Sequence, residues 1–123
     1  SLVGYASMIR ILAQEQHEGR LQIYPEALFC ASEVLTDEAR EIIYRAWQIE
    51  PFNVYEATET AGIASETIAH DGLKMYEDLV CIEVVNENNH AVPFGEYGVK
   101  VLATVLFTRT LPLIRYEITD SIA

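Results

Sequence analysis

Residues 28–60, LFCASEVLTDEAREIIYRAWQIEPFNVYEATET, predict a strand, a helix and a second strand. Leu28–Ala31 is a short, wholly apolar run typical of a strand buried in a parallel sheet, and residues 52–55 have the aromatic and β-branched character of another. Between them, Thr36 is a good N-cap for a helix that runs until Pro51 stops it. This order predicts a right-handed βαβ unit with two parallel strands.

Polar residues follow both predicted strands directly. Ser32 and Glu33 come after the first, and Tyr55-Glu56-Ala57-Thr58-Glu59-Thr60 closes the second. Because the carboxyl ends of parallel strands meet at one edge, where open α/β sheets bind ligands, we expect both segments to line one crevice. An aromatic face suits a purine, a hydroxyl suits a phosphate oxygen and a carboxylate suits Mg²⁺. A polar turn after a strand is also an ordinary structural feature, which stays the alternative.

The flanking residues extend this pattern to a mixed α/β fold. An amphipathic helix is expected over residues 4–18, and period-two alternation follows Gly62. Strands are predicted at Val80–Val85, 99–107 and 113–118, which favours an antiparallel meander or a partial barrel. We therefore divide the chain into an α/β part, about residues 1–61, and a mainly β part, about residues 62–123.

Length and composition bound the class of protein. The 123 residues suit one soluble domain, and the chain has neither a basic and apolar leader nor the ~20 consecutive apolar residues of a membrane span, which favours the cytoplasm. The net charge of −11 argues against nucleic acid or an anionic membrane as partner. Cys30 and Cys81 lie in apolar runs and are expected to be buried free thiols.

The acidic charge is concentrated in the middle of the chain. Residues 50–96 contain ten Asp and Glu residues and a single base, Lys74. A polyphosphate bound here would need cations from Mg²⁺, from helix amino termini or from another part of a larger protein.

Five segments, in this order, resemble the core motifs of the adenylate-forming superfamily, and most of all its phenylacetate–coenzyme A ligase-like branch. They are SEVLT (32–36), YEATE (55–59), GEYG (95–98), PLIRY (112–116) and RYEITD (115–120). The resemblance covers nearly the whole chain. It implies a fragment of an adenylate-forming large domain, from an enzyme that activates a carboxylic acid with ATP and Mg²⁺ and passes the acyl group to coenzyme A or another acceptor.

The resemblance also implies roles for individual residues. Tyr55 would stack on adenine, Thr58 would contact the α-phosphate, and Glu59 would ligate Mg²⁺; Thr58 and Glu59 are thus the candidate catalytic residues. Asp120 would accept hydrogen bonds from the ribose hydroxyls, which suits a carboxylate with two oxygens.

Three further residues complete the predicted nucleotide site. Ser32 and Glu33 would lie beside the adenine, chiefly through backbone contacts. Arg115 either pairs with a site carboxylate, Glu59 or Asp120, which we favour, or forms an ion pair within a sheet.

Departures from the family pattern limit what the resemblance implies. Ile118 and Thr119 stand where the family has Thr-Gly, which puts the shape of the ribose turn in doubt. Relatives often carry a Cys and a His near two positions that are Thr67 and Lys74 in this chain. Because neither of these residues has a thiolate or an imidazole, we expect no metal site there.

Two parts of the family's active site have no counterpart in this sequence. Its Ser-, Thr- and Gly-rich phosphate loop would lie upstream and its catalytic lysine downstream, so we expect the chain to need these lobes and to be inactive alone. The alternative is a binding or assembly module that keeps the fold without the chemistry. The sequence leaves the acid substrate and homo-oligomerisation open.

Overall fold

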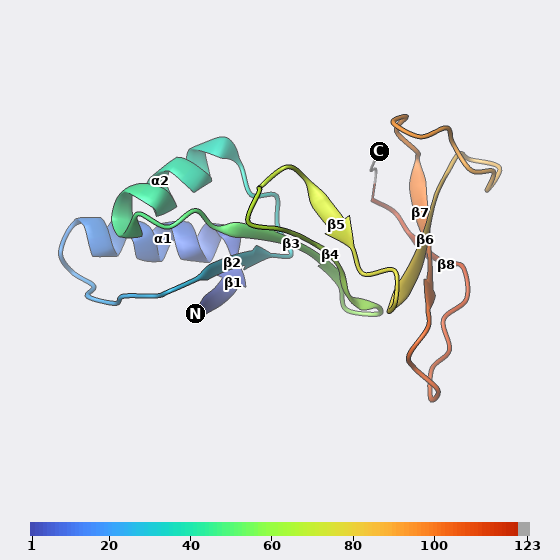
Figure 1. Cartoon of the computed structure of the whole chain (residues 1–123), viewed down its shortest axis with the longest axis horizontal. Helices are drawn as coiled ribbons and strands as arrows, with labels where there is room; N and C mark the ends of the chain where they lie inside the picture. Colours follow the sequence, from blue (N-terminus) through green and yellow to red (C-terminus); the bar gives the residue numbers. More distant parts are fainter. Residues whose placement is uncertain (121–123) are drawn as a thin grey trace. The chain divides into compact units, whose positions relative to one another are not determined.

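The computed structural model of the chain describes residues 1–120 and divides into two units, Ser1–Met75 and Tyr76–Ala123. The first unit contains both helices and a five-stranded sheet, and the second contains a three-stranded sheet (Figure 1). Within residues 1–120, neither helix has the length and apolar character needed to cross a bilayer.

Three parallel strands form the start of the first sheet. β1 (Leu2–Tyr5), β2 (Leu28–Ala31) and β3 (Phe52–Ala57) pair in sequence order. α1 (Ala6–His17) connects the first two and α2 (Asp37–Trp47) the next two, and both helices pack on the same face of the sheet (Figure 1). The predicted βαβ unit is therefore confirmed, and it is the second of two consecutive units.

The sheet changes direction after β3. β4 (Ala61–Glu66) pairs antiparallel with β3, and β5 (Leu73–Met75) pairs antiparallel with β4. The sequence did not predict β4 and β5 as strands, because β4 is rich in small residues of weak β propensity and β5 has only three residues. β4 is a strand because it pairs with β3, since the β propensity of its own residues is weak.

The predicted first helix began two residues too early. Residues 2–5 form a strand, and the helix starts at Ala6. Pairing with β2 and the hydrogen bond from Leu2 N to the Ala27 carbonyl, 2.8 Å long, fix this segment as β1. Four residues are too few for a periodic pattern to distinguish a strand from a helix start.

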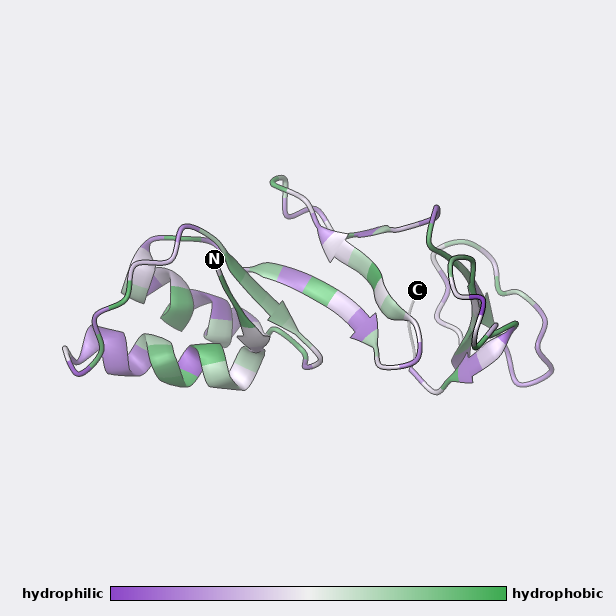
Figure 2. Ribbon diagram, turned by 90° about the horizontal axis from the view of Figure 1, so that it is seen from below, coloured by the Kyte–Doolittle hydropathy of each residue, from purple (hydrophilic) through white to green (hydrophobic). Residues whose placement is uncertain are grey.

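The core of the first unit lies between the sheet and the two helices. Figure 2 shows both helices alternating between hydrophilic and hydrophobic residues, as expected for helices with one buried face. The Thr36 hydroxyl accepts a hydrogen bond from Ala39 N at 3.2 Å, which confirms the predicted N-cap of α2. The buried residues of this core are Ala6, Ile9, Ala13, Leu28, Cys30, Leu35, Ala39 and Ile43.

Burial has a chemical effect on one of these residues. Cys30 is fully buried, as predicted, and desolvation raises the pKa of its thiol to about 11.

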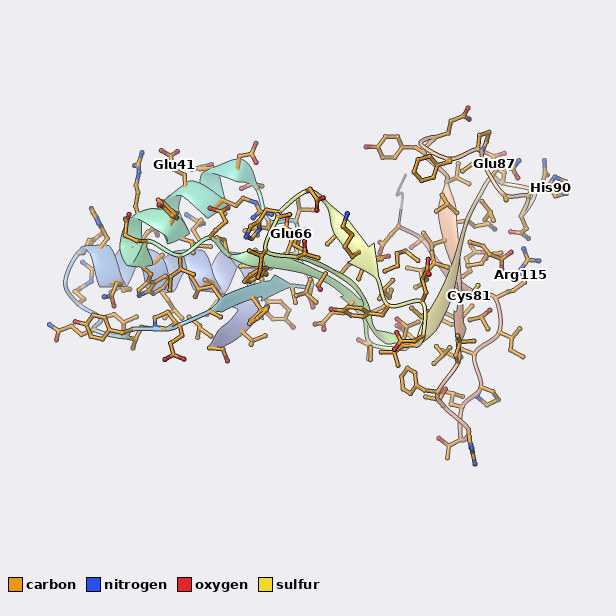
Figure 3. The ribbon with its side chains drawn as sticks, in the orientation of Figure 1. Glu41, Glu66, Cys81, Glu87, His90 and Arg115 are labelled. Atoms are coloured by element: carbon orange, nitrogen blue, oxygen red, sulfur yellow. The ribbon has the colours of Figure 1, made fainter. Side chains whose placement is uncertain are left out.

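A charged cluster links α2 to the sheet. The side chain of Glu66 is only 8% exposed; its carboxylate pairs with Arg40 on α2, accepts a hydrogen bond from Asn53 N at 2.8 Å and lies 3.1 Å from His70 Nδ1 (Figure 3). Burial alone would raise the pKa of Glu66, but the hydrogen bonds from Asn53, Arg40 and His70 outweigh it and leave the pKa below its usual value. The His70 ring also stacks on Phe52, with centroids 4.9 Å apart.

The second unit is an antiparallel sheet of β6 (Val80–Val85), β7 (Lys100–Val105) and β8 (Tyr116–Ile118). The predicted meander is confirmed, but β7 and β8 are shorter than expected. Arg115 has a φ of 49°, which breaks the extended backbone before β8. Cys81 is exposed on β6, so its predicted burial is wrong. It lies on a strand that alternates its side chains between two faces.

The turn that precedes β7 is built on two glycines. Gly95 has a φ of 82°, which is accessible to glycine at little cost. Gly98 is buried against β6: a Cβ there would lie 2.6 Å from Val84 Cγ1 and 2.8 Å from the Val85 carbonyl oxygen. The adjacent Val99 N donates to that same carbonyl at 3.0 Å. In the family-like segment 95–98, position 98 therefore packs so closely against β6 that only glycine fits.

Gly98→Ala is expected to destabilise the second unit by roughly 1–3 kcal/mol, because a buried methyl must displace backbone atoms of β6. Gly4→Ala is the matched control, since its Cβ would make only an ordinary contact of 3.8 Å with Ile9. Amide hydrogen exchange of β6 and β7 measures the effect locally. Equal protection of these strands in wild type and Gly98→Ala would contradict the packing argument.

Candidate functional site

The end of β2 and the β3–β4 hairpin enclose a pocket of about 360 Å³. Its lining residues are Ser32, Glu56, Ala57, Thr58 and Ala61. Ser32 directly follows β2, and the other four lie on β3, the hairpin turn and the start of β4. Ser32 and Glu56 are 24 residues apart in sequence. The two polar segments nevertheless meet at one edge of the sheet, as predicted.

Unusual backbone geometry shapes this pocket. Ser32 has a φ of 62° and Ala61 a φ of 57°, a left-handed conformation that residues other than glycine adopt at a cost. The register of β3 against β4 also shifts between Tyr55 and Glu56. The extra residue is on β4: Tyr55 pairs with Ala64 and Glu56 with Gly62, which leaves Ile63 between them without a pairing partner in β3. Strained backbone therefore lies on both sides of the pocket, at Ser32 after β2 and at Ala61 at the start of β4.

The hairpin turn separates exposed polar side chains from a buried one. Thr58 and Glu59 are exposed, whereas Thr60 is 1% exposed and its hydroxyl lies 3.3 Å from the Ala61 carbonyl oxygen, to which it donates. Thr60 N also donates to the Ala57 carbonyl at 3.2 Å. Thr60 thus stabilises the turn, and Thr58 and Glu59 are the residues that this turn presents to solvent.

β3 is longer than the sequence indicated. We expected it to end at Tyr55, but it continues to Ala57, so Tyr55 is a partly buried residue within the strand. The additional residues pair with β4, Glu56 with Gly62 and Ala57 with Ala61.

Glu56 belongs to the segment that we expected to line the crevice, but the sequence analysis assigned it no individual role. Its carboxylate lines the pocket, and Oε1 accepts a hydrogen bond from Ser32 Oγ at 3.1 Å. The sequence places an acid beside Tyr55 but contains no signal for its hydrogen bond with Ser32, which is 24 residues away. The hydrogen bond joins the two strand ends directly across the candidate site.

Glu33 lies beside Ser32 in sequence but lines a different pocket. Its Oε2 accepts a hydrogen bond of 2.8 Å from Ser7 N, in the first turn of α1. This backbone hydrogen bond lowers the pKa of Glu33. The carboxylate satisfies one of the free N–H groups at the start of the helix. Its neighbours in that second pocket include Arg10 and Thr36.

Two predicted site residues, Arg115 and Asp120, belong to the second unit. Arg115 Nε lies 3.0 Å from Glu83 Oε2, and its Nη2 donates to the Asn89 carbonyl at 3.3 Å. This is the ion pair within a sheet that the sequence left as the alternative to a pair with Glu59 or Asp120. Asp120 is exposed. The nucleotide-binding roles of both residues stay predictions.

The described residues contain no preformed metal cage. In residues 1–120, no group of three or more His, Cys, Asp or Glu side chains is arranged to hold a metal ion. Mg²⁺ is commonly bound by one or two carboxylates, with substrate phosphates and water as the other ligands. An exposed carboxylate on a turn, as at Glu59, suits that form of binding.

Solved structures identify the fold. 2-Hydroxyisobutyryl-CoA ligase, in an open conformation with 2-HIB-AMP and CoA, matches 94% of this chain with a TM-score of 0.78 and 24% sequence identity. MatB from Rhodopseudomonas palustris matches 85% with a TM-score of 0.60 and 16% identity. This chain has the fold of part of an adenylate-forming ligase. The N-terminal subdomain of Klebsiella oxytoca NpsA, solved with 3-hydroxyanthranilyl-AMSN, also has this adenylate-forming fold; it matches 85% with a TM-score of 0.61 and 18% identity.

The adenylate-forming fold is present here over a limited length. The chain spans 29% of the matched 2-hydroxyisobutyryl-CoA ligase structure, 22% of MatB and 27% of NpsA. No family model matches the sequence, and no curated protein matches it. The match to these structures shows the fold that the motifs in the sequence resemble.

Proposed function

We propose that this chain is the central section of an ATP-dependent ligase that activates a carboxylic acid. In this reaction the carboxylate attacks the α-phosphorus of ATP, pyrophosphate leaves, and the acyl-adenylate then transfers its acyl group to the thiol of coenzyme A with release of AMP. The observation that carries the proposal is the pocket in which Ser32 meets Thr58 at the carboxyl edge of parallel strands. Ligands bind at this edge in open α/β sheets.

In the first unit, different residues would contact the adenine base and the phosphates. Tyr55 supplies the aromatic face for adenine, and the Thr58 hydroxyl donates to an oxygen of the α-phosphate. Ser32 and Glu33 bring backbone groups beside the base. Because Glu33 caps α1 with its own carboxylate, only its backbone is available for that contact.

Glu59 would hold Mg²⁺, which supplies positive charge to the phosphate oxygens when it is bound. The Glu59 carboxylate would hold the ion beside the phosphates, and the Thr58 hydroxyl on the same turn would position the reacting phosphate. In the second unit, the Asp120 carboxylate would accept hydrogen bonds from the two ribose hydroxyls. Arg115 would bind the nucleotide only if it exchanged its ion pair with Glu83 for one with the ligand.

The proposed active site also needs groups from other parts of the same protein. The segment 50–96 has ten acids and one base, so the cations that stabilise the transition state would come from the rest of the ligase. We place the protein in the phenylacetate–coenzyme A ligase-like branch on the motifs given above.

ATP–pyrophosphate exchange tests the proposal directly. We expect the full-length protein to exchange pyrophosphate in the presence of its carboxylic acid and the purified 123-residue chain to show none. The chain alone offers the α-phosphate few preorganised donors, and loss of even one such donor commonly lowers a rate about 10²–10³-fold. Exchange by the chain alone would contradict the second expectation, and a full-length protein that binds ATP without exchange would favour the alternative, a binding module.

A further inference from the structure

The pocket at the end of β2 is rich in hydrogen-bond acceptors and has no cation in its lining. Its polar groups are the Glu56 carboxylate and the hydroxyls of Ser32 and Thr58, and its remaining lining residues, Ala57 and Ala61, have only methyl side chains. The Ser32 hydroxyl donates to Glu56 Oε1 and so occupies one of several acceptor positions of this carboxylate. The carboxylate therefore keeps acceptor capacity for a ligand in the pocket.

The backbone gives this arrangement at the expense of local strain. Ser32 and Ala61 both line the pocket and both have positive φ values, and β4 has one extra residue, Ile63, opposite the Tyr55–Glu56 step of β3. Left-handed conformations of residues other than glycine, and bulges, concentrate at functional sites. Three departures from ordinary geometry around one carboxylate indicate that its position serves binding.

We propose that Glu56, held by Ser32, is a specificity-determining residue that accepts a hydrogen bond from an N–H, ammonium or O–H group of the ligand. This inference rests on the proposed adenylate-forming function and goes beyond it. A ligand that fills the pocket removes water from the carboxylate, and an acceptor without a donor is then strongly unfavourable. A ligand with a donor at this point is preferred for that reason.

Two parts of the reactants could supply the donor. One is the exocyclic amine of adenine, and the other is an amino or hydroxyl group on the carboxylic acid. Both place the same chemistry against Glu56 Oε1 or Oε2, so matched pairs of ligands separate them.

The experiment uses the full-length protein and two matched comparisons. ATP is compared with purine riboside triphosphate, which lacks the amine, and amino or hydroxy acids are compared with acids of the same carbon skeleton without that group. Exchange rates and equilibrium binding by calorimetry are measured for wild type, Glu56→Ala, Glu56→Gln and Ser32→Ala. Glu41→Gln is the control, because Glu41 is an exposed residue on α2 outside the pocket.

Wild type is expected to prefer the donor-bearing ligand in one of the two comparisons by about 10- to 100-fold, the range of a hydrogen bond to a charged group. Glu56→Ala should lose this preference, Ser32→Ala should reduce it, and Glu41→Gln should keep it. The inference is overturned by a wild type without preference in either comparison, or by a preference that survives in Glu56→Ala. Binding of ATP without exchange would overturn the adenylation proposal alone, and the binding preferences would still decide the role of Glu56.

Discussion

Glu59→Gln in the full-length protein is expected to lower the rate of acyl-adenylate formation by about 10²–10³-fold, comparable to the loss of one preorganised electrostatic group. The substitution keeps the size of the side chain and removes the negative charge that would hold Mg²⁺ against the phosphates. Because Glu59 is exposed on the β3–β4 turn, the variant protein should keep its fold. Acyl-adenylate formation is measured at saturating ATP and Mg²⁺, with a thermal melt for each variant.

Asp120→Asn provides the comparison for Glu59→Gln. It should weaken ATP binding by about 10- to 100-fold, as expected for hydrogen bonds to a charged group worth roughly 1.5–3 kcal/mol, with a smaller effect on the rate at saturation. If neither variant changes nucleotide affinity or adenylation, the adenylate-forming proposal loses its physical basis. A collapse of the melting temperature would instead mark these acids as structural.

Glu66→Gln is expected to destabilise the first unit by about 2–3 kcal/mol at pH 7. The substitution removes the negative charge of Glu66, which is the most buried ion-pair partner of Arg40. The Arg40 side chain is only 20% exposed, so its positive charge is then poorly compensated. Glu50 lies 3.2 Å from the same guanidinium and offsets part of the loss. Urea unfolding measures the change. Glu41→Gln is the matched control, since the Glu41–Arg45 pair is exposed on both sides and contributes about 0.3–0.5 kcal/mol.

The pH dependence of this effect has a definite sign. The folded-state pKa of Glu66 lies below the ordinary value of 4.5, so the folded protein binds this proton less readily than the unfolded chain does. The stabilisation is therefore complete above pH 4.5 and is lost as the pH falls through the folded pKa. Wild type should lose more stability than Glu66→Gln between pH 6 and pH 3, roughly the range over which such groups titrate. Parallel pH profiles would contradict the assignment.

The sequence predicted best those elements in which several local signals agree. α2 has a capping hydroxyl at Thr36, acids in its first turn, an apolar stripe and a proline after its end, and it occurs where these signals place it. β6 appears with the bounds predicted from its sequence, although the burial of its side chains does not alternate strictly. In such segments, local preference and tertiary packing favour the same structure.

The parts that the sequence did not predict depend on pairing between distant strands. β1 is a strand because it pairs with β2, and β4 is a strand because it pairs with β3. The same limit applies to the site. Ser32 and Thr58 could be assigned to one edge from the βαβ topology, whereas the hydrogen bond between Ser32 and Glu56 joins distant segments in a way that no local pattern of residue types predicts.

The unequal burial of the two cysteines offers a natural labelling scheme. Cys30 is enclosed in the core with a thiol pKa of about 11, so it holds little thiolate at neutral pH, whereas Cys81 is exposed on β6. A maleimide fluorophore or spin label added to the folded wild-type chain should therefore attach at a single point in the second unit. A second cysteine introduced at an exposed position of the first unit, such as Glu41, would then allow the distance between the two units to be followed while nucleotide is added.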